Sequence, residues 1–364
     1  PAGPRERETV VMRLSAQAER VERDIIRHCH RGLPVSALQQ QVLGSLRRLM
    51  PVDAAFFATA DPETLLFTGA YSEEPLAEAT SMFLANEFGC ADVNKFATLA
   101  VSGRHVATLD GATRRDRPSS PRSRDIMQPL GLGDELRAAL IAGGDCWGYL
   151  CLHRDQGPLG FSSGEAAAVA RLGPHIAHGL RQAILLHSPA HGSDAPGPGV
   201  ILLAKDLSVV AVTAEAEHLL SLVEGDVPTR LALPIAVYTV AVALTAAARG
   251  ESTSQALPST RVQTRDGRWL NVHASRLQGR QDEDQVAIVV EAIEPRATVP
   301  LKLSAYGLSA RECEVARLVI RGASTRTIVE TLHISHHTVQ DHLKAVFEKT
   351  GVHSRRDLVG RLLH

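Results

Sequence analysis

Apolar residues recur every three or four positions in four successive stretches between residues 308 and 363, the period of amphipathic helices. A serine precedes each stretch. Ser309 with Glu312, and Ser354 with Asp357, fit the reciprocal capping pattern of a helix N-terminus, and Ser335 fits it loosely. Gly322 stands where the first helix should end, in a position that favours glycine. The pattern predicts a bundle of four short helices.

The third of these helices has two distinct faces when it is projected at about 100° per residue. Val339, Leu343 and Val346 fall on one side, where they would pack on Ile328 and Leu332 of the helix before. The opposite side is polar and carries His337, Gln340, Asp341, Lys344 and Glu348. One interpretation is a surface that reads DNA bases, and the other is an ordinary solvated helix face.

Two side chains on the polar side favour the first interpretation. Gln340 and Lys344 lie four residues apart, so both can reach into one groove. Glutamine can bond adenine and lysine can bond guanine, each with about 1–3 kcal/mol of discrimination. Asp341 can accept a hydrogen bond from cytosine, and a purely electrostatic DNA-binding face would not include acids.

The same segment resembles the DNA-binding domain of LuxR-type transcription factors. The resemblance rests on residues 311–315, 321–322, 334–335, 338–344, 349–352 and 354–356. In that family the third helix enters the major groove of double-stranded DNA, which implies base reading by His337, Gln340, Asp341 and Lys344. Many relatives carry a basic residue where Asp341 stands, so the preferred DNA sequence should differ here.

The resemblance also implies phosphate contacts and a dimer. Residues at two helix N-termini bind phosphates in the family, because free N–H groups and the helix dipole point there. The corresponding residues are Ser324, Thr325, Ser335, Thr338 and Lys349. The fourth helix mediates dimerisation, which implicates Leu358 and Leu362. A homodimer would read a pseudo-palindromic operator, and contact with RNA polymerase is compatible with such a regulator.

Charge is unevenly distributed although the net charge is −1. From Ser304 onward there are 9 Lys and Arg against 6 Asp and Glu, a balance of +3; the remainder has 30 against 34, a balance of −4. The larger part of the chain is therefore not expected to hold DNA by itself.

The chain shows no pattern of an enzyme or of a cofactor-binding motif: no phosphate loop, nucleophile elbow or HExxH is present. Five scattered cysteines and a charged start (Arg5 to Glu8) are typical of a cytoplasmic protein with no metal site. The uncharged stretch from Leu231 to Ala248 is long enough to span a membrane, but it is rich in alanine. We expect it to be a buried helix.

Two Pro-containing stretches, of which the first is also rich in Gly and Ser, divide the chain into three units, with linkers at residues 188–199 and 294–303. The central unit, 200–293, should contain strands at 200–204, 209–212, 260–265, 269–277 and 286–292, and helices between the second and third strands. Asp266-Gly267 predicts a hairpin turn. This order resembles a PAS-like sensor domain in topology.

The first unit, residues 10–187, begins and ends with helices whose apolar positions step by three and four, a pattern typical of coiled coils. Strands are expected at 54–59, 65–69, 138–142 and 147–153. The order resembles a GAF domain, and the segments 61–64 and 144–154 resemble parts of actinobacterial regulators that join a GAF domain to a LuxR-type domain. In that architecture the flanking helices pair across a dimer axis, which implicates Val21, Ile25, Ile176 and Leu180.

Aromatic residues of the first unit are candidates for lining an effector pocket or for the core. They are Phe56, Phe67, Phe83, Phe96 and Trp147. Cys151 and His153 share a strand face, but a third metal ligand is not visible in the sequence. The segment from Asp110 to Asp125 holds five arginines and is expected to be a mobile surface loop, with contact to DNA or an anionic effector as the alternative.

The sequence thus predicts an α+β, multi-domain chain: a GAF-like unit, a PAS-like unit and, over residues 304–364, an all-α helix-turn-helix domain. The predicted function is that of a dimeric, sequence-specific transcriptional regulator controlled by a small-molecule effector. Two alternatives stay open: a regulator gated by protein–protein contact with no small ligand, and a cofactor-bearing sensor.

Overall fold

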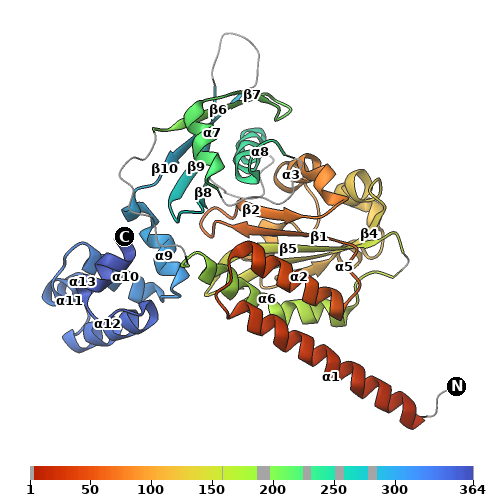
Figure 1. Ribbon diagram of the computed structural model, residues 1–364, viewed down its shortest axis with the longest axis horizontal. Helices are drawn as coiled ribbons and strands as arrows, with labels where there is room; N and C mark the ends of the chain where they lie inside the picture. The colour runs from red at the N-terminus through yellow and green to blue at the C-terminus, as the bar shows by residue number, and fades with distance from the viewer. Residues whose placement is uncertain are drawn as a thin grey trace.

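The computed structural model describes residues 4–157, 159–186, 197–223, 231–250, 258–277 and 285–363. Three lobes are visible in Figure 1: a sheet unit from which the first helix projects, a second sheet unit, and a head of short helices at the C-terminus. The mixed helix-and-sheet class agrees with the prediction. Most of the predicted linker 188–199 lies outside the described residues.

The first unit contains a five-stranded antiparallel sheet in the order β2-β1-β5-β4-β3. Its strands are β1 (Ala54–Ala60), β2 (Phe67–Ser72), β3 (Val106–Thr108), β4 (Leu132–Ala142) and β5 (Asp145–Asp155). One face is covered by long helices, α1 (Pro4–Cys29), α2 (Val35–Leu49) and α6 (Ser163–Ala183), and the other by α3 (Thr80–Gly89) and α4 (Phe96–Val101). The short elements η1 (Leu76–Ala79), α5 (Leu109–Thr113), η2 (Arg117–Ser119) and η3 (Ser123–Met127) connect these strands and helices.

A bulge in β5 decides which face of the first sheet receives Trp147. Leu140 pairs with Gly148, but the next residue of β4, Ile141, pairs with Cys146, so Trp147 is an extra residue in its strand. Simple alternation would place Trp147 with Tyr149. The bulge instead turns it to the face covered by α2 and α6, where it is buried.

The second unit repeats the strand order of the first. Its sheet runs β7-β6-β10-β9-β8, and each pair is antiparallel. The elements are β6 (Gly199–Leu203), β7 (Val209–Val212), α7 (Ala214–Ser221), α8 (Ile235–Arg249), β8 (Ser259–Gln263), β9 (Trp269–Arg276) and β10 (Val286–Ala292). The predicted strands and helices of this unit are therefore confirmed to within a few residues. Gly267 has φ +81° in the predicted turn, a conformation that favours glycine.

Helix α8 lies between the two sheet units and is apolar on both sides. Ala236, Val237 and Val240 pack on the second sheet, whereas Ile235 and Tyr238 pack with the aromatic core of the first. A helix that is apolar all round must be buried all round, and this explains the stretch without charges. No described helix is long and apolar enough to cross a membrane.

The predicted linker 294–303 is instead an ordered connection. It forms a 3-10 turn, η4 (Pro295–Thr298), and most of a helix, α9 (Val299–Ala305). Leu301 and Ala305 pack with the core of the first unit, while Val299 and Leu303 pack in the core of the head. Helix α9 therefore joins two cores, one on each side.

The head contains the four predicted helices, α10 (Ala310–Ile320), α11 (Thr325–Leu332), α12 (His336–Thr350) and α13 (Arg355–Leu363). Ser309 and Glu312 form the expected capping box, and Ser324 and Ser335 cap the next two helices. Val339, Leu343 and Val346 are buried with Ile328, as the pattern predicts.

The residues predicted to form a dimer interface are buried inside a single chain. Val21, Ile25, Ile176 and Leu180 belong to the core of the first unit, and Leu358 and Leu362 are fully buried in the head. They are at most 5% exposed, so they offer no surface to a second copy in this conformation. A dimer contact through α1, α6 or α13 must use other side chains of these helices.

Two leucines on α9 should have separable effects, because they face different cores. Leu303→Ala should destabilise the head by about 2–5 kcal/mol and speed amide hydrogen exchange in α10 and α12. Leu301→Ala should leave exchange in α12 unchanged and speed it in α9, since it loosens only the contact with the first unit. Hydrogen exchange with mass spectrometry measures both, and identical exchange patterns in the two variants would contradict the two-sided packing.

Candidate DNA-binding head and sensor sites

The predicted reading face of α12 is open to solvent. The side chains assigned to base reading, His337, Gln340, Asp341 and Lys344, are all exposed. Gln340 and Lys344 line a hollow of about 560 Å³ that continues past Phe347 to the end of the helix. His337 Nε2 lies 3.9 Å from Asp341 Oδ2, a weak contact that leaves both side chains mostly exposed. Because they lie on one exposed face of α12, these side chains can enter a groove of DNA together.

The predicted phosphate-binding residues fall into two groups. Ser324, Ser335 and Thr338 lie at the N-termini of α11 and α12, and the Oγ atoms of the two serines accept hydrogen bonds from the backbone N–H groups of Thr327 and Thr338 at 3.1 and 3.0 Å. These hydroxyl groups close the helix ends and still lie at the surface. They are compatible with phosphate at these positions.

Thr325 and Lys349 are bonded to other side chains of the head. The Thr325 hydroxyl accepts a hydrogen bond from Arg355 at 2.8 Å, and Arg355 also donates to the Ala323 carbonyl. Lys349 Nζ donates to Glu312 Oε2 at 2.7 Å, so it binds the carboxylate that also caps α10. Arg355 thus brings a cation to the N-terminus of α11, a role that the sequence interpretation did not assign to it.

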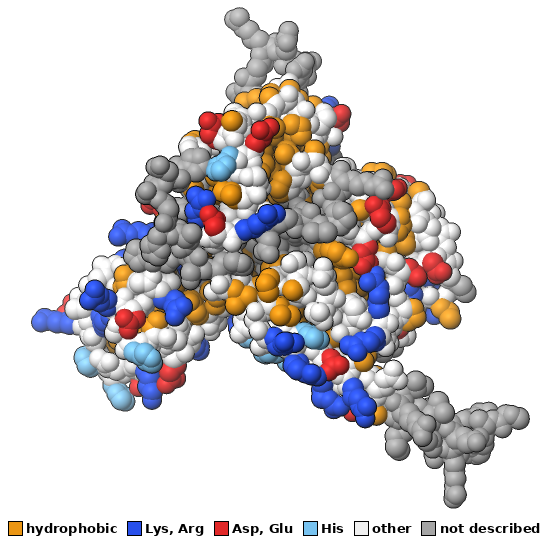
Figure 2. Space-filling model, viewed as in Figure 1, with side chains coloured by type: hydrophobic (Ala, Val, Ile, Leu, Met, Phe, Trp, Pro, Cys, Tyr) orange, Lys and Arg blue, Asp and Glu red, His pale blue; other side chains and the backbone are white. Residues whose placement is uncertain are grey.

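Charges of both signs cover the head. Figure 2 shows Lys and Arg, Asp and Glu, and His side chains interleaved on the visible face of this lobe. The pattern agrees with the small positive balance of +3 counted in the sequence from Ser304 onward (9 Lys and Arg against 6 Asp and Glu). Affinity for DNA must therefore depend on fitted contacts more than on general attraction.

The four phenylalanines predicted for an effector pocket do come together, but as a packed cluster. Phe56 and Phe83 have ring centroids 4.9 Å apart, and Phe67 lies 6.0 Å from Phe96. The space beside Phe56 and Phe83 is only about 20 Å³. Trp147 lies on the opposite face of the sheet, so the five residues do not line one cavity.

A buried network of charged side chains adjoins the aromatic cluster. Arg122 Nη2 lies 2.7 Å from Glu135 Oε2, and Arg137 Nη1 lies 2.6 Å from Glu87 Oε2. The Arg137 guanidinium also stacks over Phe96, 4.4 Å from the ring centroid. Burial alone would raise the pKa of Glu135, but Arg122 and Arg137 outweigh it and lower that pKa. Paired in this way, the charges can remain buried.

The position of Arg122 corrects the prediction for the segment from Asp110 to Asp125. This segment is ordered into short helical turns, and the Arg122 side chain is 1% exposed. Arg117 Nε lies 2.6 Å from Asp110 Oδ1. The segment is therefore not the mobile surface loop that was expected, because three of its five arginines, Arg117, Arg122 and Arg124, pair with acidic side chains of the same unit.

Cys151 and His153 have a third neighbour that was not visible in the sequence. The antiparallel register places Glu135 of β4 opposite His153, and Cys151 Sγ lies 3.1 Å both from Glu135 Oε1 and from His153 Nε2. Such a triad could hold a metal ion. Glu135, however, already binds Arg122 and Arg137, and these guanidinium groups disfavour an additional cation.

A helix-turn-helix whose third helix has an exposed polar face, joined to two sheet units with enclosed cores, is the architecture of a DNA-binding regulator with a sensor domain. Residues 307–362 match the family model of bacterial regulatory proteins, luxR family, and residues 34–180 match the model of the GAF domain. The chain thus carries a LuxR-family DNA-binding domain and a GAF domain. No curated protein matches the chain.

Solved structures with some similarity include two complexes. The Vibrio cholerae VqmA–ligand–DNA complex is 18% identical, covers 46% of this chain and 81% of that chain, and has a TM-score of 0.20. The Escherichia coli DhaR(N)–DhaL complex is 12% identical, covers 77% and 90%, and has a TM-score of 0.24. These scores are too low to support a structural argument.

The buried histidine should make the stability of the first unit depend on pH. Burial lowers the pKa of His153 from 6.5 to about 4. Between these values the unfolded chain binds a proton that the folded chain does not, so the free energy of unfolding should fall as pH falls from 6.5 to 4, by up to about 3 kcal/mol. Urea unfolding across this range should show a smaller slope with pH in His153→Gln than in the exposed control His218→Gln. Equal slopes would contradict a buried neutral His153.

Proposed function

We propose that this protein is a sequence-specific, homodimeric transcriptional regulator whose sensor units respond to a small-molecule effector. The observation that carries the proposal is the exposed face of α12, where Gln340 and Lys344 project from a helix whose opposite side is buried in a LuxR-family domain. Hydrogen bonds from these two side chains would read base edges in the major groove. Asp341 and His337 would adjust the base preference.

Dimer formation is supported by the charge of the head. The head has a charge balance of +3 from Ser304 onward (9 Lys and Arg, 6 Asp and Glu), so its binding would release few counterions from DNA. One head alone should therefore bind DNA weakly. Two heads held by a common sensor would bind half-sites about one helical turn apart, in a pseudo-palindromic operator. Contact of the bound dimer with RNA polymerase is part of the proposal.

The second sheet unit is proposed to be PAS-like. Its strand order, in which the first strand β6 lies between the second, β7, and the last, β10, and its helices between β7 and β8 support this assignment. Because α8 packs on both sheets, an effector in either unit would affect the other.

A regulator gated by a protein partner is the second candidate. It is favoured by the tight packing of the predicted aromatic pocket, which leaves about 20 Å³. A thermal-shift screen with metabolites separates the candidates, because only a small-molecule sensor should be stabilised. An absorption band beyond that of the aromatic residues would indicate the third candidate, a cofactor-bearing sensor.

The reading face is tested by truncating its two central side chains. Lys344→Ala and Gln340→Ala should each weaken binding to a selected operator by about tenfold or more, consistent with 1–3 kcal/mol per base contact. They should also relax base preference at separate positions of the half-site. Selection of bound DNA fragments followed by sequencing, and then fluorescence anisotropy, measures both effects.

Arg124→Ala is the matched control, since it removes one exposed positive charge from the arginine-rich segment of the first unit. It should leave affinity and preference unchanged. If both head variants bind as the parent chain does, the assigned reading face is wrong. If Arg124→Ala alone weakens binding, DNA contacts the sensor.

A further inference from the structure

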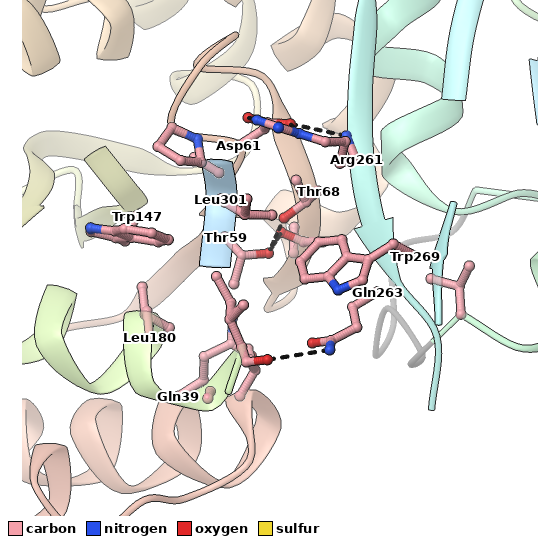
Figure 3. Close-up of a pocket in the computed structure, with 18 of the residues that line it drawn as sticks. Gln39, Thr59, Asp61, Thr68, Trp147, Leu180, Arg261, Gln263, Trp269 and Leu301 are labelled. Atoms are coloured by element: carbon pink, nitrogen blue, oxygen red, sulfur yellow. Dashed lines mark hydrogen bonds and ion pairs between the residues drawn. The ribbon is translucent and has the colours of Figure 1, made fainter. Parts of the chain in front are cut away.

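A cavity of about 110 Å³ lies where the two sheet units and α9 meet. Figure 3 shows Trp147 and Leu180 on the side of the first unit, Trp269 and Gln263 on the side of the second, and Leu301 of α9 between them. Trp147 and Trp269 are the two tryptophans of the chain, and both line this space.

The polar side chains of the cavity are mostly paired. Thr68 donates to Thr59 at 2.6 Å between the hydroxyl oxygens. Arg261 forms two bonds to Asp61, at 2.6 and 2.8 Å, and lies 2.9 Å from Glu63. The charged residues of the lining, Asp61 and Arg261, therefore neutralise each other, and a charged ligand would find no counter-charge.

The two indole N–H groups differ in their partners. Trp147 Nε1 donates to the Ala142 carbonyl at 3.0 Å. Among the described residues no partner is found for Trp269 Nε1, and Figure 3 shows this nitrogen on the side of the cavity nearest Gln263. A donor in this position would bind a ligand oxygen or nitrogen that accepts a hydrogen bond.

We propose that this junction cavity binds a neutral molecule of a single ring that carries a hydrogen-bond acceptor, and that the bound molecule holds α9 in its docked position. The size limits the ligand to one ring, because this cavity of about 110 Å³ is somewhat smaller than one of about 150 Å³ that binds benzene in another protein. Apolar walls provided by both tryptophans, Leu180 and Leu301 favour a ring over a polar chain.

Ligand binding in the cavity is coupled to the head because the cavity walls belong to three parts of the chain, the two sheet units and α9. The cavity is complete only when both sheet units and Leu301 are together, so a ligand that needs all the walls binds the docked arrangement more tightly than a released one. The same helix places Val299 and Leu303 in the core of the head. A ligand bound in this site therefore fixes the position of the head. The inference rests on the proposed function only in one respect, namely that the position of the head controls DNA binding.

The test uses cyclohexanone as the probe and the full chain without DNA. Tryptophan emission should change in a saturable manner with cyclohexanone, and amide exchange in α9 should slow severalfold at saturation. Cyclohexanecarboxylate has the same ring with a charge, and it should produce neither effect. Simple collisional quenching would increase linearly and would not saturate.

Two substitutions locate the binding. Ala183→Leu fills the cavity from α6, where Ala183 is buried, and should weaken cyclohexanone binding by roughly tenfold or more. Ala170→Leu, the same change at an exposed position of α6, should bind as the parent chain does. Leu301→Ala removes one wall; it should weaken binding and abolish the slowing of exchange in α9, which keeps the test valid if Ala183→Leu fails to fold.

The absence of saturable binding, or binding that Ala183→Leu and Leu301→Ala both leave intact, would overturn the site. Saturable binding with unchanged exchange in α9 would overturn the coupling. Neither result depends on DNA, so failure of this inference is distinct from failure of the assigned reading face.

Discussion

The packing of α9 on two cores is the contact on which the relation between sensor and head depends. A helix of seven residues cannot hold a domain in place by its own hydrogen bonds, because so short a helix is marginal in water. Its position is fixed by burial: Leu301 and Ala305 pack in the core of the first unit, and Val299 and Leu303 pack in the core of the head. The side-chain contact between Ser304 and Asp145 adds a polar link at the same place.

The two sheet units are packed against each other next to α9. The two sheets share α8 as a common layer, so that they form continuous packing and not two units on a flexible tether. On the face of the first sheet opposite α6, beside the aromatic cluster, the paired charges of Arg122, Glu135 and Arg137 connect neighbouring elements in a buried interior, where removing one partner is costly. The core that receives Leu301 and Ala305 of α9 includes residues of both sheet units.

Much of the architecture could be predicted from the sequence where local rules dominate. Serine caps, the glycine at position 322 and the two faces of α12 are local features, and the structure has them as predicted. The strands of the second unit are also marked by local apolar runs and by the turn at Asp266 and Gly267.

What could not be predicted depends on contacts between distant residues. Nothing local shows that the Pro-containing segment 294–303 is helical, since its order comes from the two cores that it enters. Glu135 meets Cys151 and His153 through strand register, and a bulge turns Trp147 to the other face. The coiled-coil spacing of α1 and α6 correctly indicated apolar helix faces, but these faces pack within the chain. Periodicity alone cannot distinguish a partner helix of the same chain from one of a second copy.

The most direct test of the account is a distance distribution between the head and the sensor in the chain without DNA. Spin labels at Glu348→Cys on α12 and Gln40→Cys on α2, with Cys90 and Cys313 replaced by serine, report the position of the head by pulsed electron paramagnetic resonance. A docked α9 predicts one narrow distribution that becomes broad when Leu301→Ala is added. A broad distribution in the parent chain, unchanged by Leu301→Ala, would contradict it.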